Sequence, residues 1–146
     1  MVKKILQEFD IKERDVRQIP ALTLAYLGDC IYELVIRTML VEQGLSHVSE
    51  LNKAASSRAK ASAQAELLHR IEPLLSEEEL AAYKRGRNVK SAGIAKHATV
   101  IDYRTATGFE ALMGYLYVND RLDRILELVK AGEPAAAEVT DGPKEQ

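Results

Sequence analysis

The sequence predicts an all-α fold in a single domain, and three observations support this prediction. Apolar residues recur at helical spacing over long stretches, and no segment alternates apolar and polar residues with the period of a strand. Proline, glycine and capping residues divide the chain into segments of helical length. The 146 residues, 47% of them hydrophobic and 29% charged, are enough to build one core.

The first long helix is expected between Pro20 and Gly44. Proline suits the first turn of a helix, and glycine suits the position that ends one. Asp29, which follows Gly28, interrupts the apolar stripe. Burying an unpaired carboxylate costs several kcal/mol, so Asp29 needs a partner or a function. The stripe expected to face the core is Leu24, Leu27, Ile31, Leu34, Val35 and Leu40.

The middle of the chain predicts two or three further helices. One begins at Ser46 or Ser49, and the alanine-rich run that follows continues as one or two helices to about Arg70. Ser76 and Glu79 have the spacing of a capping box, which predicts a short helix ending near Arg85. The acids at positions 77–79 are expected to be solvated in its first turn.

The second half predicts a basic loop, two helices and a tail. Residues 85–99, "RGRNVKSAGIAKHAT", are expected to form a loop with at most a helical turn. Helices are expected over residues 107–119 and about 120–131. Residues 1–131 are therefore expected to form the domain, and residues 132–146 an acidic, disordered tail. The core-facing residues of the two helices are Phe109, Leu112, Met113 and Leu116, then Leu122, Ile125, Leu126 and Val129.

Composition excludes several classes of protein. Cys30 is the only cysteine, so an intrachain disulfide and a cysteine zinc site are excluded, and a cytoplasmic setting fits. No apolar run is long enough to span a bilayer, and the N-terminus lacks the apolar core of a secretory signal.

Charge is unevenly distributed along the chain. The net charge is -2, but residues 132–146 contribute -3, which leaves +1 for residues 1–131. Between Tyr83 and Arg104 there are six basic residues and one acid. This segment can meet the phosphates of a nucleic acid. Its basic residues are Lys84, Arg85, Arg87, Lys90, Lys96 and Arg104.

Two acids, Asp29 and Glu110, each interrupt an otherwise apolar helix. They are 81 positions apart, so only the fold can bring them together. Two carboxylates in a partly buried place repel each other unless a cation lies between them. Oxygen ligands favour a hard ion such as Mg²⁺ or Mn²⁺. Together with the basic segment, the pair indicates metal-assisted hydrolysis of phosphodiesters.

Structural explanations exist for each of these features. Glu110 follows Thr107 by three residues, as in a capping box at a helix start. A buried arginine or tyrosine hydroxyls could satisfy Asp29, and the basic segment could be a solvated loop. Glu66 and His69 have the spacing of a di-iron motif, but the second such motif that a di-iron site needs is missing.

Three motifs resemble the ribonuclease III family. "LAYLGDCIYE" is similar to that family's signature, and "TGFEALMGYLY" is similar to its second motif. "YKRGRNVKS" followed by "YRTATGFEALMGYLY" resembles the Mini-III branch, which has no double-stranded RNA-binding domain. The resemblance covers roughly residues 18 to 130.

The resemblance implies an all-helical homodimer that cleaves double-stranded RNA with Mg²⁺, for which Mn²⁺ can substitute, and leaves 5′-phosphate and 3′-hydroxyl ends. In Mini-III the substrate is large-subunit ribosomal RNA precursor, and a ribosomal protein assists. By position, Asp29 and Glu110 would be the catalytic, metal-binding acids, and Tyr26 would lie in the dimer interface. The residues expected to hold RNA are Arg85, Arg87, Lys90, Lys96 and Arg104.

The sequence departs from the wider family at two positions. Ala25 and Thr107 stand where that family has carboxylates, although Mini-III tolerates similar losses. A non-catalytic RNA-binding or ribosome-assembly module on the same fold is therefore the first alternative. A helical protein–protein adaptor, in which the basic segment is incidental, is the second.

Overall fold

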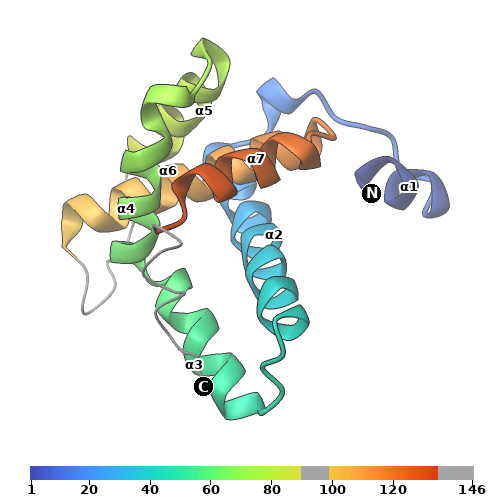
Figure 1. Cartoon of the computed structure of the whole chain (residues 1–146). Coiled ribbons are helices and arrows are strands. Elements are labelled where there is room, and N and C mark those ends of the chain that lie inside the picture. Colours follow the sequence, from blue (N-terminus) through green and yellow to red (C-terminus); the bar gives the residue numbers. More distant parts are fainter. Residues whose placement is uncertain (90–98, 135–146) are drawn as a thin grey trace.

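The computed structural model describes residues 1–89 and 99–134, which form helices joined by short connections (Figure 1). Within these two ranges there is no strand, which confirms the all-α prediction. No helix in the same ranges is long and apolar enough to cross a membrane. The helices are α1 (Val2–Glu8), η1 (Val16–Gln18), α2 (Ala21–Glu42), α3 (Val48–Ala59), α4 (Ala61–Ile71), η2 (Glu72–Leu74), α5 (Glu77–Arg87), α6 (Val100–Val118) and α7 (Leu122–Gly132).

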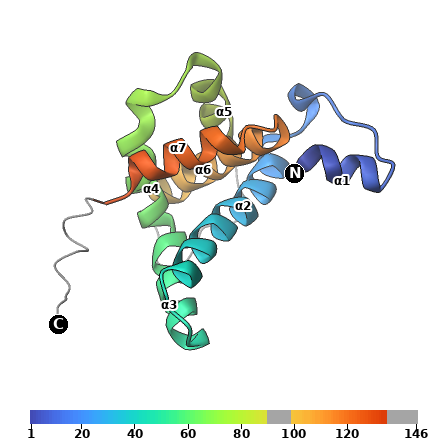
Figure 2. The same ribbon diagram turned by 45° about the vertical axis from the view of Figure 1, so that its right-hand side comes forward.

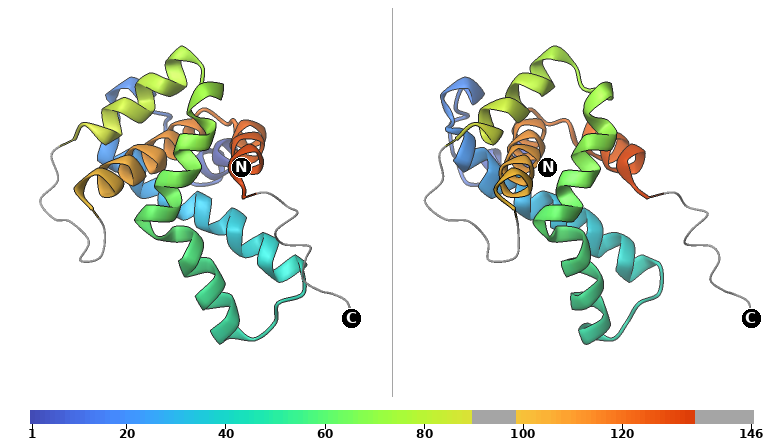
Figure 3. Two further views of the ribbon diagram at one scale, coloured as in Figure 1. Left: turned by 60° about the vertical axis from the view of Figure 1, so that its left-hand side comes forward. Right: turned by 90° about the vertical axis from the view of Figure 1, so that its left-hand side faces the viewer.

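Helix α6 is the centre of the bundle. It packs against α2, α4, α5 and α7, and its most extensive contact is with α2 (Figure 3). Phe109, Leu112 and Met113 are fully buried along it. The ring of Phe109 meets that of Tyr32 from α2 edge to face, with the centroids 5.0 Å apart. The buried side chains of α6 are therefore held from several sides.

Two glycines let α2 and α6 approach until their backbones touch. A Cβ atom on Gly28 of α2 would overlap the carbonyl oxygen of Glu110 on α6. A Cβ atom on Gly114 of α6 would overlap the carbonyl oxygen of Leu24 on α2. Only glycine fits at these two positions, so the pair sets both the separation and the register of the two helices.

Helix α5 begins as its sequence predicts. The side chain of Ser76 accepts a hydrogen bond from the backbone of Glu79, and the Glu79 side chain accepts one from the backbone of Ser76. This confirms the predicted capping box. A Cβ on Gly108 of α6 would lie 2.6 Å from the ring of Tyr83 on α5. The absence of a side chain at Gly108 therefore lets α5 pack closely against α6.

The predicted boundaries are confirmed at some helices and wrong at others. Pro20 directly precedes α2, and Gly44, with φ +104°, lies just beyond its end, as expected. The alanine-rich run forms two helices that meet at Lys60. The predicted start of the first at Ser46 or Ser49 is wrong, because α3 begins at Val48 without a side-chain cap.

Three residues expected in the core are solvent-exposed. Leu34 is 50% exposed, because it lies on the face of α2 that no described helix covers. Leu122 and Leu126 of α7 are 41% and 46% exposed, whereas Ile125 and Val129 are buried. The inward face of α7 is therefore narrower than its apolar residues indicate.

Helix α7 packs across α4 and α6 (Figure 2). A partly buried ion pair fixes it there. Arg124 donates to both carboxylate oxygens of Glu79, at 2.8 and 2.9 Å, and to the carbonyl of Leu74 at 2.9 Å. The prediction that all the acids at 77–79 are solvated is wrong for Glu79, which is 5% exposed. Its charge faces a cation that is distant in sequence.

Candidate active site

The fold brings Asp29 and Glu110 together. Gly28 lies against the backbone of Glu110, so the next residue of α2, Asp29, lies beside the Glu110 side chain. The Asp29 carboxylate lies close enough to Glu110 to raise the pKa of the Glu110 carboxyl. Two acids that are 81 positions apart in the sequence therefore meet where α2 crosses α6.

The pKa of Glu110 is raised by its surroundings. Burial raises the pKa of Glu110 from 4.5 to about 8, and the neighbouring Asp29 carboxylate acts in the same direction. Asp29 itself is exposed, so the expectation that it is buried in the core stripe is wrong. The pair therefore has one carboxyl at the surface and one half-buried beneath it.

A third side chain of the site, Gln64 of α4, was missed by sequence reasoning. Gln64 is 1% exposed, and its amide lies beside Glu110, where it weakly opposes the rise in the pKa of Glu110. Neither Nε2 nor Oε1 reaches full hydrogen-bond geometry with any described residue. A buried polar group left unpaired costs about 1–3 kcal/mol. In the sequence, Gln64 looks like one more polar residue of an alanine-rich helix.

The residues present fit a divalent cation with oxygen ligands. A cation between Asp29 and Glu110 would remove their mutual repulsion, and the orphaned amide of Gln64 gives the site a further polar group. The described residues contain no group of three or more histidines, cysteines, aspartates or glutamates that could hold a metal. Mg²⁺ in proteins is commonly coordinated by one or two carboxylates, with water in the remaining positions.

The alternative explanation of Glu110 as a helix cap is wrong. Helix α6 begins at Val100, and the Thr99 hydroxyl caps it by accepting from the backbone of Asp102 at 2.9 Å. Thr107 lies inside the helix, where its hydroxyl donates to the carbonyl of Tyr103 at 3.0 Å. Glu110 thus lies well inside α6 and is free of any capping duty at its start.

Part of the predicted basic surface lies close to this crossing. Arg85 and Arg87 are in the last turn of α5, which the contact between Gly86 and Gly108 holds against α6. Arg87 lies over the ring of Tyr83, with its guanidinium carbon 5.5 Å from the centroid. Arg104 is exposed on α6. Lys90 and Lys96 lie outside the described residues.

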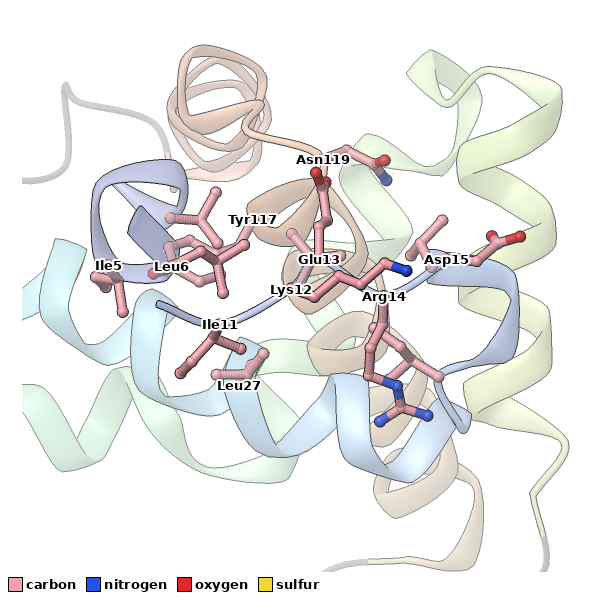
Figure 4. A pocket seen from close by; sticks show the side chains of 14 residues that line it. Ile5, Leu6, Ile11, Lys12, Glu13, Arg14, Asp15, Leu27, Tyr117 and Asn119 are labelled. Atoms are coloured by element: carbon pink, nitrogen blue, oxygen red, sulfur yellow. The ribbon is translucent and has the colours of Figure 1, made fainter. Parts of the chain in front are cut away.

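The predicted dimer contact, Tyr26, lies on an exposed apolar face of α2. Its side chain is 79% exposed, and Leu22, one turn earlier, is 45% exposed. Nearby, the N-terminal segment, α2 and the end of α6 line an open pocket of about 720 Å³, which includes Ile5, Leu27 and Tyr117 (Figure 4). Neither Asp29 nor Glu110 lines this pocket, so it is separate from the carboxylate pair.

Comparison with known proteins agrees with this geometry. A family model described as the ribonuclease III domain matches residues 22–121. The chain is 48% identical over 117 residues to Mini-ribonuclease 3 of Brevibacillus brevis, which covers 80% of this chain and 87% of that protein. It is 44% identical over 113 residues to Mini-ribonuclease 3 of Symbiobacterium thermophilum, and this match covers 77% of this chain and 87% of that protein.

The fold is similar to that of a solved structure as well. A crystal structure of a protein from Fusobacterium nucleatum superposes with a TM-score of 0.73 at 31% identity, over 81% of this chain and 94% of that one. The chain belongs to the ribonuclease III family. Within that family its relatives are the Mini-ribonuclease 3 proteins, which confirms the resemblance found in the sequence motifs.

Proposed function

We propose that this chain is a metal-dependent endoribonuclease that cleaves double-stranded RNA, with Asp29 and Glu110 as its catalytic, metal-binding residues. The observation that carries the proposal is the contact between these two acids where α2 crosses α6. Membership of the ribonuclease III family, which is metal-dependent, supports the reaction class.

The chemistry follows from the unequal burial of the two acids. Asp29 and Glu110 would hold Mg²⁺, or Mn²⁺ in its place, and such an ion activates a water and offsets charge on the phosphate. Glu110 must lose its proton to bind a cation, and its half-buried position fixes its carboxylate between α2 and α6. Asp29 is exposed, so a phosphate can approach it from solvent. Hydrolysis breaks the bond from phosphorus to the 3′-oxygen and leaves a 5′-phosphate and a 3′-hydroxyl.

The basic residues would hold the RNA backbone. Arg85 and Arg87 flank Gly86, which lies against Ala111, the residue after Glu110 on α6, and Arg104 is exposed on α6. Lys90 and Lys96, outside the described residues, belong to the same proposed surface. The base edges of an RNA duplex lie in a deep, narrow groove. Recognition should therefore depend on helix shape, phosphates and 2′-hydroxyls.

The remaining assignments concern assembly and substrate. We propose a homodimer through the exposed face around Tyr26 and Leu22, because two-fold symmetry suits the two antiparallel strands of a duplex. We further propose large-subunit ribosomal RNA precursor as substrate, a ribosomal protein as helper and a cytoplasmic setting. The catalytic domain would be residues 1–131, and residues 132–146 an acidic tail.

A cleavage assay tests the proposed activity. A long RNA duplex is incubated with the protein in Mg²⁺ or in EDTA, and the ends of the products are mapped. Asp29→Asn, an isosteric change at an exposed position, should abolish cleavage and leave the melting temperature and duplex binding nearly unchanged. If this variant instead melts lower and its activity follows the folded fraction, Asp29 is structural.

A non-catalytic RNA-binding module is the second candidate. The observation that favours it is the absence of carboxylates at Ala25 and Thr107, one turn before Asp29 and Glu110 respectively. In this case duplex RNA would be bound but no Mg²⁺-dependent products would form at any protein concentration.

A further inference from the structure

The amide of Gln64 is the one fully buried polar side chain in the described part of the chain whose polar atoms lack partners. Buried polar groups in native proteins are nearly always hydrogen-bonded, and an exception calls for an explanation. Unmet hydrogen-bonding capacity at a functional site is often completed by what the site binds.

Gln64 lies at the end of an apolar stripe on α4. Ala65, Leu68 and Ile71, which follow it on the buried side of the helix, are at most 2% exposed, so a nonpolar residue at position 64 would continue the stripe. Helix α4 packs on α6 beside α2 (Figure 3). The side chain of Gln64 thereby reaches Glu110, on the inner side of the carboxylate pair. A packing role alone requires no amide here.

With a cation bound, the site would present an ionised Glu110 oxygen and a water of the ion. The donor and acceptor groups of the Gln64 amide match these two partners. Nε2 carries two N–H donors, which suit the oxygen of an ionised Glu110. Oε1 is an acceptor, and neither carboxylate can donate to it once both have bound a cation. A water carried by the ion can donate to it, since Mg²⁺ keeps several of its waters.

We propose that Gln64 is a positioning residue, which donates to Glu110 and accepts from a water of the bound divalent ion. This inference rests on the proposed metal-binding role of Asp29 and Glu110. It adds to that role a side chain from a third helix. Residues that orient metal ligands in this way commonly change metal affinity by about 10- to 100-fold when replaced.

The test uses the full-length protein, with Mn²⁺ as the probe. Gln64→Met replaces the amide by an apolar side chain of similar volume, and Leu68→Met is the control one turn further along the same buried face. Melting temperature is measured in EDTA, and the Mn²⁺ dissociation constant is measured by titration calorimetry. Gln64→Met should melt about 2–4 °C higher than the parent protein and bind Mn²⁺ about tenfold more weakly. Leu68→Met should leave Mn²⁺ affinity unchanged.

A second variant covers the case in which Gln64→Met does not fold. Gln64→Glu keeps an acceptor oxygen at the same place and adds negative charge. It should melt lower in EDTA and bind Mn²⁺ more tightly than the parent protein, because a further anionic oxygen faces the ion. A Mn²⁺ affinity that is unchanged in both variants would overturn the proposal and make Gln64 a packing residue.

Asp29→Asn separates this inference from the function on which it rests. If Asp29→Asn weakens Mn²⁺ binding and the Gln64 variants do not, only the role of Gln64 is overturned. If Asp29→Asn leaves Mn²⁺ binding unchanged, the carboxylate pair is not the metal site, and both proposals are overturned.

Discussion

The carbonyl oxygen of Glu110 occupies the space that a Cβ atom on Gly28 would fill. This contact joins a glycine of one helix to the backbone of an acidic residue on another. It places Asp29 beside Glu110, because Asp29 is the next residue along α2. The position of Asp29 beside Glu110 thus follows from the close packing at Gly28, the residue before it.

Gly28→Ala should therefore disrupt the fold and the site together. The added methyl would overlap a backbone atom that cannot rotate away, so we expect a loss of about 3 kcal/mol or more in the free energy of unfolding. Urea unfolding measures this loss, and cleavage of duplex RNA should fall with it. Gly44→Ala is the control, because no atom lies within 4 Å of the added Cβ. It should cost only about 1 kcal/mol, through the positive φ at that position.

The raised pKa of Glu110 predicts how stability depends on pH in the absence of metal. The folded protein keeps this proton up to about pH 8, whereas the unfolded chain releases it near 4.5. Between these values the folded state binds more protons, so the free energy of unfolding should fall as the pH rises. Glu110→Gln should remove this part of the dependence and be more stable than the parent protein at pH 8. Urea unfolding in EDTA, between about pH 5 and 8.5, measures the free energy of unfolding of both proteins. The same dependence on pH for the parent protein and for Glu110→Gln would contradict the assignment.

Arg124 should be a stability residue with no part in catalysis. Arg124→Met leaves the carboxylate of Glu79 buried without its cation, which we expect to cost about 3–5 kcal/mol. The hydrogen bonds from Arg124 hold the pKa of Glu79 below its ordinary value of 4.5. The stabilisation should therefore be present above that pH and disappear in acid. Arg37→Met, which breaks the exposed pair with Glu33, should cost less than about 1 kcal/mol. Mn²⁺ affinity should be unchanged in both variants.

Charge reversal at the end of α5 tests the RNA surface. Arg85→Glu combined with Arg87→Glu should weaken binding to duplex RNA of any sequence. The slope of log affinity against log salt should become shallower by about 1 for each phosphate that the variant no longer neutralises. Lys130→Glu, at the far end of α7, is the control with a single reversal. Equal affinities for all three proteins would show that RNA binds elsewhere.

Tyr26→Glu tests the dimer. The side chain is 79% exposed in the single chain, so the substitution should not affect the folding of one protomer. At an interface, loss of a central aromatic residue costs about 2 kcal/mol or more, so the dimer should dissociate into monomers. Sedimentation velocity measures this change. Val48→Glu, at an apolar residue of α3 that is 69% exposed, should leave the oligomeric state as it was.

Local patterns in the sequence predict the helices after Pro20 and single out Asp29 and Glu110 as acids in apolar helices, because these signals lie within a few positions of one another. They do not predict α1 at Val2–Glu8. The capping box at Ser76 and the glycine after α2 are signals between residues a few positions apart. The start of α6 at Val100 lies in the segment where the apolar pattern is weak, so the predicted start at residue 107 is seven residues late. The true start is marked by Thr99, whose hydroxyl accepts a hydrogen bond from the backbone N–H of Asp102.

Features that depend on distant contacts could not be predicted in this way. Glu79 is buried because Arg124 reaches it from 45 positions away. Asp29 is exposed because of how α2 lies on α6, which the periodicity of α2 alone does not fix. Gln64 belongs to the site because α4 packs on α6, and nothing in its neighbouring residues distinguishes it.

The place of Glu110 on α6 has a consequence for how the protein fails on heating. A helix supported by four others is among the last to lose its amide protons to solvent, whereas outlying α1 and α3 can open and close without disturbing it. Hydrogen exchange should therefore be slowest along α6. Loss of catalysis at high temperature should follow global unfolding, with no earlier stage in which the bundle survives and its chemistry does not.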